Sequence, residues 1–253
     1  MKRQSLRRML ILISFILFPA TLYYLSPALI IQGAAEGIMT GSFVLFASLF
    51  VSALFLGRGF CGWVCPGAGL QECCQAVSNK NARGGRCNWI KYFIWVPWLA
   101  VIAIAAVSAG GFKSIDVFYM TKSGILVAEP NAYIIYFFVT GLITILAFTA
   151  GRRAFCHYGC WMAPFMVTGN IVGRLTRSPS LHLSADKEKC VQCKLCAKNC
   201  RMSLDVYGMV QKGSMADLEC ILCGECVDNC PKKVIRYAFG RQGCDKSNEK
   251  RRR

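Results

Sequence analysis

The sequence predicts an α-helical membrane protein with four transmembrane helices, followed by a small C-terminal α+β domain. Two observations support this prediction: four long uncharged runs in the amino-terminal region, and eight cysteines in two repeated motifs further on. The chain has 253 residues, 55% of them hydrophobic, a mean hydropathy of +0.40 and a formal net charge of +17, which is unusual for a soluble domain. We expect a transmembrane domain (1–180), a cysteine domain (181–240) and a disordered basic tail (241–253).

Each of the four uncharged runs is close to the roughly 20 residues that a helix needs to cross the hydrocarbon core. The runs are residues 9–31, 38–56, 92–112 and 132–150. The first run follows several basic residues, as the core of a signal peptide would. It is too long for such a core, and no clear cleavage site of small residues follows it. We therefore expect a membrane anchor at the amino end.

The positions of Lys and Arg orient the predicted helices. Of the 30 basic residues, all except Lys113 and Lys122 precede the first run, lie between the second and third runs, or follow residue 151. Basic residues remain on the cytoplasmic side of a membrane, so both termini are predicted to be cytoplasmic. The charge flanks the membrane segments, and no nucleic-acid-binding module is recognisable. We expect contact with membrane lipid and no nucleic-acid partner.

The cysteine domain contains the pattern C-x2-C-x2-C-x3-C twice, and a proline follows the second copy. Sixteen cysteines could suggest a disulfide scaffold, but such close spacing suits metal ligation better. Three thiolates on one short loop can wrap a 4Fe-4S cluster, while the fourth reaches the neighbouring cluster. Zinc sites usually show two separated C-x2-C pairs instead. The predicted ligand sets are Cys190, Cys193, Cys196 and Cys230 for one cluster, and Cys220, Cys223, Cys226 and Cys200 for the other.

This domain resembles the bacterial-type two-cluster ferredoxins over roughly residues 181–239. The resemblance implies a β-α-β-β-α-β fold and electron transfer rather than catalysis on a substrate. One departure is visible, because Arg201 follows Cys200 where the family often has proline. Several lysines around the motifs would favour an acidic partner or simply form a solvated face. These lysines are Lys194, Lys198, Lys232 and Lys233.

Two further cysteine pairs follow the second and fourth uncharged runs. They have the spacing C-x3-C and comprise Cys61 with Cys65, and Cys156 with Cys160. Under the predicted topology both pairs lie at the cytoplasmic membrane face, where the four thiols could meet. Three alternatives remain open: a third metal centre of thiolate-bound iron or zinc, a redox dithiol pair, or buried and inert cysteines.

The whole layout resembles the NapH-type membrane subunits of periplasmic nitrate reductase systems, which are related to the polyferredoxin parts of NosR and of FixG-type proteins. The family motif C-x3-C-P is met at Cys61–Pro66, whereas Trp161 replaces the second proline. The resemblance implies an electron-transfer subunit in the bacterial inner membrane. It would link the quinone/quinol pool to a redox partner, as part of a quinol dehydrogenase. The alternative is a thiol- or copper-handling or oxidoreductase-assembly factor of the FixG type.

Other cofactors find little support in the sequence. The only histidines, His157 and His182, lie outside the predicted spans, and no C-x-x-C-H run for haem attachment occurs. His157 is a candidate metal ligand or quinol proton acceptor, or a plain surface histidine. Gln71 and Glu72 are candidates for taking quinol protons, or are merely solvated. Iron-sulfur clusters are the redox cofactor that the sequence predicts.

Overall fold

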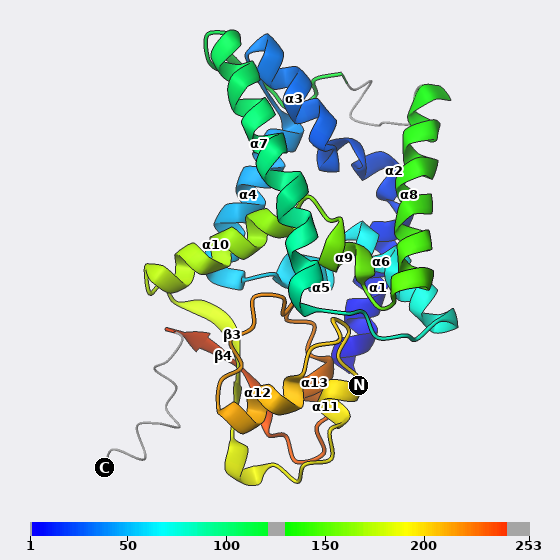
Figure 1. The fold of residues 1–253 in the computed structure, drawn as a ribbon, viewed down its shortest axis with the longest axis vertical. Coiled ribbons are helices and arrows are strands. Elements are labelled where there is room, and N and C mark those ends of the chain that lie inside the picture. The colour runs from blue at the N-terminus through cyan, green and yellow to red at the C-terminus, as the bar shows by residue number, and fades with distance from the viewer. Residues whose placement is uncertain (1, 121–129, 242–253) are drawn as a thin grey trace.

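The computed structural model describes residues 2–120 and 130–241 of the chain. Lys122 and all but the first residue of the predicted tail lie outside the described residues. The described part is mostly helical. Long helices form its upper half, whereas short helices, loops and a pair of strands form its lower half (Figure 1).

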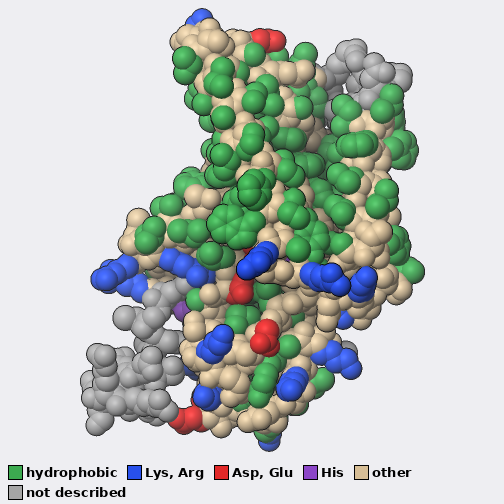
Figure 2. All heavy atoms as spheres, viewed as in Figure 1, with side chains coloured by type: hydrophobic (Ala, Val, Ile, Leu, Met, Phe, Trp, Pro, Cys, Tyr) green, Lys and Arg blue, Asp and Glu red, His purple; other side chains and the backbone are tan. Residues whose placement is uncertain are grey.

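Three long apolar helices dominate the upper half. They are α4 (Gly41–Leu56), α7 (Ile90–Ser108) and α8 (Pro130–Ala150). Two helical stretches, Gly85–Ser108 and Tyr133–Ala150, are long and apolar enough to cross a membrane, whereas α4 is shorter. Only 11% of the apolar window in each of the two long stretches is buried, so most of their side chains face outward. Figure 2 shows these apolar side chains covering the upper half, with most Lys and Arg side chains below them.

The first predicted span differs from the structure, because residues 9–31 do not form one helix. The chain bends twice, since a new short helix begins at Phe18 with Pro19 in its first turn, and Ser26 takes an extended conformation before Pro27. The ring of a proline disfavours a helical conformation of the residue before it, which explains the extended backbone of Ser26. The segment is therefore divided into α1 (Lys2–Ile16), α2 (Phe18–Thr21), the 3₁₀ helix η1 (Tyr23–Leu25) and α3 (Pro27–Glu36).

A short pair of parallel strands joins the far ends of α4 and α7. The strands are β1 (Ile38–Thr40) and β2 (Ser114–Asp116). At the start of α4, the Thr40 side chain accepts a hydrogen bond from the backbone N–H of Phe43 at 3.3 Å. This cap satisfies a backbone donor that the helix itself leaves unpaired.

The upper half contains an internal repeat of a long helix, a short helix and a third helix. The first copy is α4, α5 (Gly59–Trp63) and α6 (Pro66–Val77); the second is α8, α9 (Ala154–Tyr158) and α10 (Ala163–Leu175). The 3₁₀ helix η2 (Gly85–Trp89) leads from the first copy into α7. α10 packs along α4, and α6 packs between α1 and α8.

Two glycines permit the close packing of α10 on α4. A Cβ atom on Gly169 would lie 2.5 Å from the carbonyl oxygen of Phe50, and one on Gly173 would lie 2.6 Å from that of Leu54. Small residues allow helix backbones to approach in this way. The contact holds the two copies of the repeat together.

The lower half is built on one antiparallel strand pair, β3 (Ser180–Ala185) and β4 (Ile235–Gly240). Between them lie the 3₁₀ helix η4 (Lys187–Lys189), α11 (Leu195–Lys198), α12 (Val206–Lys212) and α13 (Glu225–Asp228). The two inner strands of the predicted β-α-β-β-α-β order are absent from the described residues, so that part of the prediction is wrong. α12 lies there instead, because Asp205 caps its start and Gly213 ends it in a left-handed conformation.

Candidate metal centres

The cavity that we call the outer site lies between the first motif and the end of the second. It is lined by Cys190, Cys193, Cys196 and Cys230, together with Tyr207, Pro231 and Val234. These four cysteines are one of the two predicted ligand sets. Cys193 is exposed, and the other three are partly buried. The outer site therefore lies near solvent.

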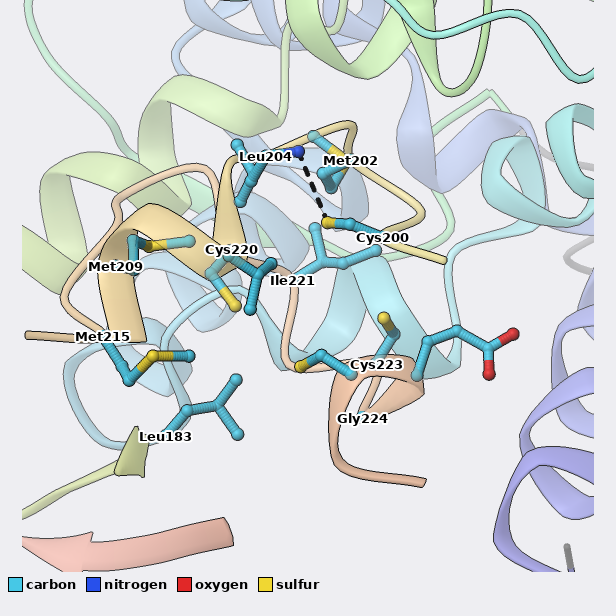
Figure 3. A pocket seen from close by; sticks show the side chains of 13 residues that line it. Leu183, Cys200, Met202, Leu204, Met209, Met215, Cys220, Ile221, Cys223 and Gly224 are labelled. Atoms are coloured by element: carbon cyan, nitrogen blue, oxygen red, sulfur yellow. Dashed lines mark hydrogen bonds between the residues drawn. The ribbon is translucent and has the colours of Figure 1, made fainter. Parts of the chain in front are cut away.

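The cavity that we call the inner site contains the other predicted set. Cys200, Cys220, Cys223 and Cys226 line it together with methionine, leucine and isoleucine side chains. Figure 3 shows Cys200, Cys220 and Cys223 among these apolar side chains. Burial raises the pKa of Cys200 to about 11 and that of Cys220 to about 12. A dry cavity that penalises free thiolates in this way suits thiolates that are bound to iron.

Backbone turns in the two motif loops have matching geometry. Gln192 and Lys194 in the first loop, and Leu222 and Gly224 in the second, all have positive φ angles between 52° and 75°. Such turns direct successive backbone N–H groups toward one side and form anion-binding concavities that are found around iron-sulfur clusters. Each loop therefore has a backbone suited to a negatively charged cluster.

The fourth cysteine of each motif also accepts a backbone hydrogen bond. Leu204 N–H donates to Cys200 Sγ at 3.4 Å, as drawn in Figure 3, and Val234 N–H donates to Cys230 Sγ at 3.3 Å. Hydrogen bonds to ligating sulfur stabilise the anionic form and tune the metal centre. The donor set and its surroundings fit two 4Fe-4S clusters, although the assignment of each cysteine remains a prediction.

The two C-x3-C pairs lie close together in a region that we call the membrane-side site, and Cys61 is the one member that does not line the cavity of the other three. Cys61 lies on α5 and Cys156 on α9, while Cys65 and Cys160 lie just beyond those short helices. All four are 3–5% exposed. Cys65, Cys156 and Cys160 line one cavity, and Gln71 Nε2 lies 3.3 Å from Cys156 Sγ. The sequence left three interpretations open: a metal centre, a redox dithiol pair and inert cysteines. Each of them has to be compatible with four buried thiols.

A repeated sequence, Arg-x-Phe-Cys, builds both halves of the membrane-side site. It reads Arg58 to Cys61 in the first copy and Arg153 to Cys156 in the second. In each copy the N–H of the last cysteine returns to the Phe carbonyl, at 3.0 Å for Cys65 and 2.9 Å for Cys160. The shared turn explains why both pairs converge. The arginine that precedes each pair also belongs to the site, and cysteine spacing alone did not identify it.

These two arginines are buried beside the thiols. Arg58 is 0% exposed and Arg153 is 1% exposed. Among the described residues, Arg58 Nε and Nη2 and Arg153 Nε have no hydrogen-bond partner. Burial raises the pKa of Cys61, and the nearby arginines act in the opposite direction. Unpaired buried cationic donors next to four thiols indicate a place that favours negative charge, as a thiolate-bound centre would supply.

The inner site lies directly against the membrane-side site. A Cβ atom on Gly62 of α5 would lie 2.2 Å from the carbonyl oxygen of Ile221, so only glycine allows this approach. Trp63 Nε1 donates to the Leu222 carbonyl at 3.0 Å, and Gln4 Nε2 donates to the Cys223 carbonyl at 3.0 Å. The loop of the second motif is thus fastened to the C-x3-C segment.

Buried ion pairs strengthen this junction. Glu219, just before the second motif, pairs with Arg58 and Lys91 from the upper half. Glu72 on α6 pairs with Arg7 and Arg153. Burial acts to raise the pKa of Glu72, but the two arginines outweigh it and lower this pKa to about 2. Glu72 therefore stays ionised and is held in place by its two arginines. The interpretation of Glu72 as a merely solvated carboxylate did not anticipate this.

His157 is buried in the junction, so the interpretation as a plain surface histidine is wrong. It is 1% exposed, and burial lowers its pKa to about 4. Its Nε2 lies 3.0 Å from the Met202 carbonyl and its Nδ1 lies 2.9 Å from Asn88 Oδ1. The ring connects α9 to the lower half, and it does not line the cavity that holds Cys156 and Cys160.

Within the described ranges, the cysteines are free rather than disulfide-bonded. In the same ranges, no three His, Cys, Asp or Glu side chains are close enough together to hold a single metal ion. The eight cysteines of the two repeated motifs instead line two cavities. A cluster requires ligands spaced around it, whereas a single zinc ion requires sulfurs that meet about 2.3 Å from one point.

Comparisons with known proteins agree with this geometry. A family model described as "4Fe-4S dicluster domain" matches residues 189–235, which contain both motifs. A second model, described as "4Fe-4S binding domain", matches twice, over residues 38–83 and 131–179. These two matches coincide with the internal repeat and contain the two C-x3-C pairs. No solved structure matches.

Three relatives illustrate the similarity. The chain is 24% identical over 80% of its length to "Putative electron transport protein YccM" of Escherichia coli K12, and it covers 57% of that protein. It is 26% identical over 79% of its length to "Regulatory protein NosR" of Stutzerimonas stutzeri, of which it covers 28%. It is 23% identical over 74% of its length to "Ferredoxin-type protein NapH" of Haemophilus influenzae, of which it covers 64%. The chain thus spans less than two thirds of each of these relatives.

The resemblance predicted from the cysteine motifs is confirmed by these comparisons. Relatives of the NapH, NosR, NirI and RdxA types share most of the chain's length, and the iron-sulfur domain models cover both kinds of cysteine motif. The chain therefore resembles the NapH/NosR-type polyferredoxins, at 23–26% identity to these relatives.

Proposed function

We propose that the protein is a membrane-bound electron carrier, which passes electrons between the quinone/quinol pool and a redox partner protein. The observation that carries this proposal is the succession of three cysteine sites. The membrane-side site lies at the base of the apolar helices, the inner site is packed against it through Gly62 and Ile221, and the outer site reaches solvent at Cys193. When bound, 4Fe-4S clusters would supply one-electron donors and acceptors along this succession.

The proposal places the apolar upper half in a bacterial inner membrane. α4, α7, α8 and the bent α1–α3 segment would make four crossings, with both termini cytoplasmic. The outward-facing apolar side chains of α7 and α8 support this placement. The gathering of Lys and Arg below the long helices also supports it (Figure 2).

We place a third iron-sulfur centre at the membrane-side site, held by Cys61, Cys65, Cys156 and Cys160. Two observations support it: the unpaired N–H groups of Arg58 and Arg153, and the similarity of both segments to a 4Fe-4S binding domain. Arg58 and Arg153 would donate to the sulfurs and balance the negative charge of the thiolates. Burial of all four thiols argues against the copper- or thiol-handling alternative, because exchange chemistry requires accessible sulfur.

A cavity of about 410 Å³ suits the quinol ring. Ile11 and Leu12 of α1 form its apolar wall, while Arg201 and Glu225 form part of its polar wall. Glu72 also lines it, and this carboxylate would act as a hydrogen-bond acceptor that its two arginines hold in place. The cavity is linked to the membrane-side site through Arg153, which pairs with Glu72 and donates to the Cys61 carbonyl at 2.8 Å. The quinol would release its two protons to water at the mouth of the cavity.

Site-selective cluster loss would test the order of the sites. Cys193→Ala should remove the outer cluster, and Cys223→Ala should remove the inner one. We expect added duroquinol to reduce the inner cluster of C193A, as measured by low-temperature EPR under anaerobic conditions. In C223A, duroquinol should fail to reduce the outer cluster. Dithionite provides the control, because it should reduce whichever cluster remains in either variant.

The opposite result would contradict the proposal. If duroquinol reduces the outer cluster of C223A as fast as that of the wild type, the inner site does not lie on the path from quinol. If duroquinol reduces no cluster in the wild type while dithionite reduces all of them, quinol is not the donor.

A further inference from the structure

The two cysteine motifs have the same backbone but opposite exposure. Each residue of the second motif follows its counterpart in the first by a constant interval, so Cys190 corresponds to Cys220 and Cys200 to Cys230. Residues 191–195 of the first loop are all exposed, whereas residues 221–226 of the second loop are all buried. One half of a pseudo-symmetric domain is docked, and the equivalent half is open.

The contacts of the docked half show which side chains the surface of such a motif binds. Ile221 is its apolar anchor, 1% exposed and pressed against α5. Acidic side chains flank the anchor: Glu219 pairs with Arg58 and Lys91, and Asp228 pairs with Arg3. The second motif therefore presents an apolar centre with an acidic rim, and the upper half supplies the matching cations.

The open half has the same layout with the opposite charge. Val191, the counterpart of Ile221, is 55% exposed. Lys189 and Lys198 stand at the positions equivalent to Glu219 and Asp228. Lys194 lies between them and is also exposed. Acidic residues nearby only partly offset these lysines, since Asp186 pairs with Lys189 at 2.8 Å and Glu188 follows in η4.

We propose that this open half docks an acidic electron-transfer protein. The docking surface comprises Lys189, Lys194 and Lys198 around the exposed side chains of Val191 and Cys193, and we call it the basic face. An apolar centre inside a charged rim is the usual build of a protein interface, and complementary charge guides and orients the partner. The inference rests on the proposed function, and it adds the class of partner and the place where that partner binds.

Charged redox probes can test the basic face without knowledge of the partner. The dithionite-reduced protein, freed of excess dithionite, would be mixed with substoichiometric hexacyanoferrate(III), an anion, or hexaamminecobalt(III), a cation. Cluster reoxidation would be followed by stopped-flow absorbance. The test variant is K189Q/K194Q/K198Q. The matched control is R83Q/R86Q/R177Q, which removes the same charge from exposed positions elsewhere on the chain.

We expect the test variant to react with hexacyanoferrate(III) roughly tenfold more slowly than the wild type at 0.01 M salt, since three charges then act within one screening length. The control variant should react nearly as the wild type does. The difference should vanish at high salt and reverse in direction for the cationic probe. Equal rates for the test and control variants would overturn the basic face as a docking surface.

The same samples separate this inference from the proposed function. Iron content and the EPR signal of each variant are measured before mixing. If the wild type contains no 4Fe-4S clusters, the proposed function fails and the inference fails with it. If clusters are present and reducible but the two variants behave alike, only the inference fails.

Discussion

Glu219 allows a direct test of how the two halves are joined. Its carboxylate lies 2.5 Å from Lys91 Nζ and also accepts from Arg58 Nη1, and both cationic side chains are fully buried. The change Glu219→Gln removes the charge that both cations share and preserves the shape of the side chain. Breaking a buried pair costs about 3–5 kcal/mol, because an uncompensated charge remains in a dry site. Each 1.4 kcal/mol is a factor of ten, so the undocked form should rise roughly a hundredfold to several thousandfold.

Amide hydrogen exchange in detergent would measure this change. The amides of residues 219–226 should exchange faster in E219Q, because the loop leaves the upper half more often. Asp186→Asn is the matched control, since it makes the same chemical change at an exposed pair with Lys189 and should leave those amides unaffected. Equal protection of residues 219–226 in E219Q and the wild type would refute the reasoning.

Two further changes probe the same junction. Glu72 has a pKa of about 2 rather than its ordinary 4.5, so its contribution to stability is complete above about pH 4.5 and declines as pH falls toward 2. Urea unfolding between pH 7 and pH 3.5 should show a steeper acid-dependent decline in the wild type than in E72Q, because Glu219 and Asp228, whose pKa values are also lowered, despite burial, by their cationic partners, titrate in both proteins; matching slopes would contradict it. Gly62→Ala should loosen the Ile221 loop and cost about 1–3 kcal/mol, because a backbone oxygen occupies the space of the new methyl group. Gly84→Ala meets nothing within 4 Å and serves as its control; equal hydrogen exchange in the two variants would count against the close packing.

The sequence supported the parts of the fold that depend on local pattern. Apolar length alone predicted the helices at 92–112 and 132–150, which the structure places as α7 and α8. The same rule failed for residues 9–31, because composition does not register the two prolines that bend the segment into shorter helices. It also failed between the two motifs, where an Asp cap and a terminating Gly favour α12 over the strands that the resemblance implied.

The junction between the halves could not be predicted from one sequence. In the sequence, Arg58 and Lys91 served only to orient the predicted transmembrane helices. Nothing in the local pattern pairs them with Glu219, which is far away along the chain. Charge balance across a buried interface is a property of the folded chain. The one available signal was the repeated Arg-x-Phe-Cys, which places a cation at the same position before each C-x3-C pair.

The open and docked halves of the cysteine domain illustrate the same limit. The spacing of both motifs is identical, so the sequence assigned them equal roles. Their charges differ, with Lys189 and Lys198 in the first motif facing solvent where Glu219 and Asp228 in the second meet cations. Only the fold shows that the second motif is covered and the first is exposed.

The central claim is a chain of three iron-sulfur centres that begins at the membrane-side site. Anaerobic iron and acid-labile sulfide counts test it most directly, on the purified wild type and on a variant with Cys61, Cys65, Cys156 and Cys160 all replaced by Ala. We expect about twelve irons in the wild type and about eight in the variant, as three and two 4Fe-4S clusters require. About eight irons in both proteins would contradict it and leave the buried thiols without a cluster.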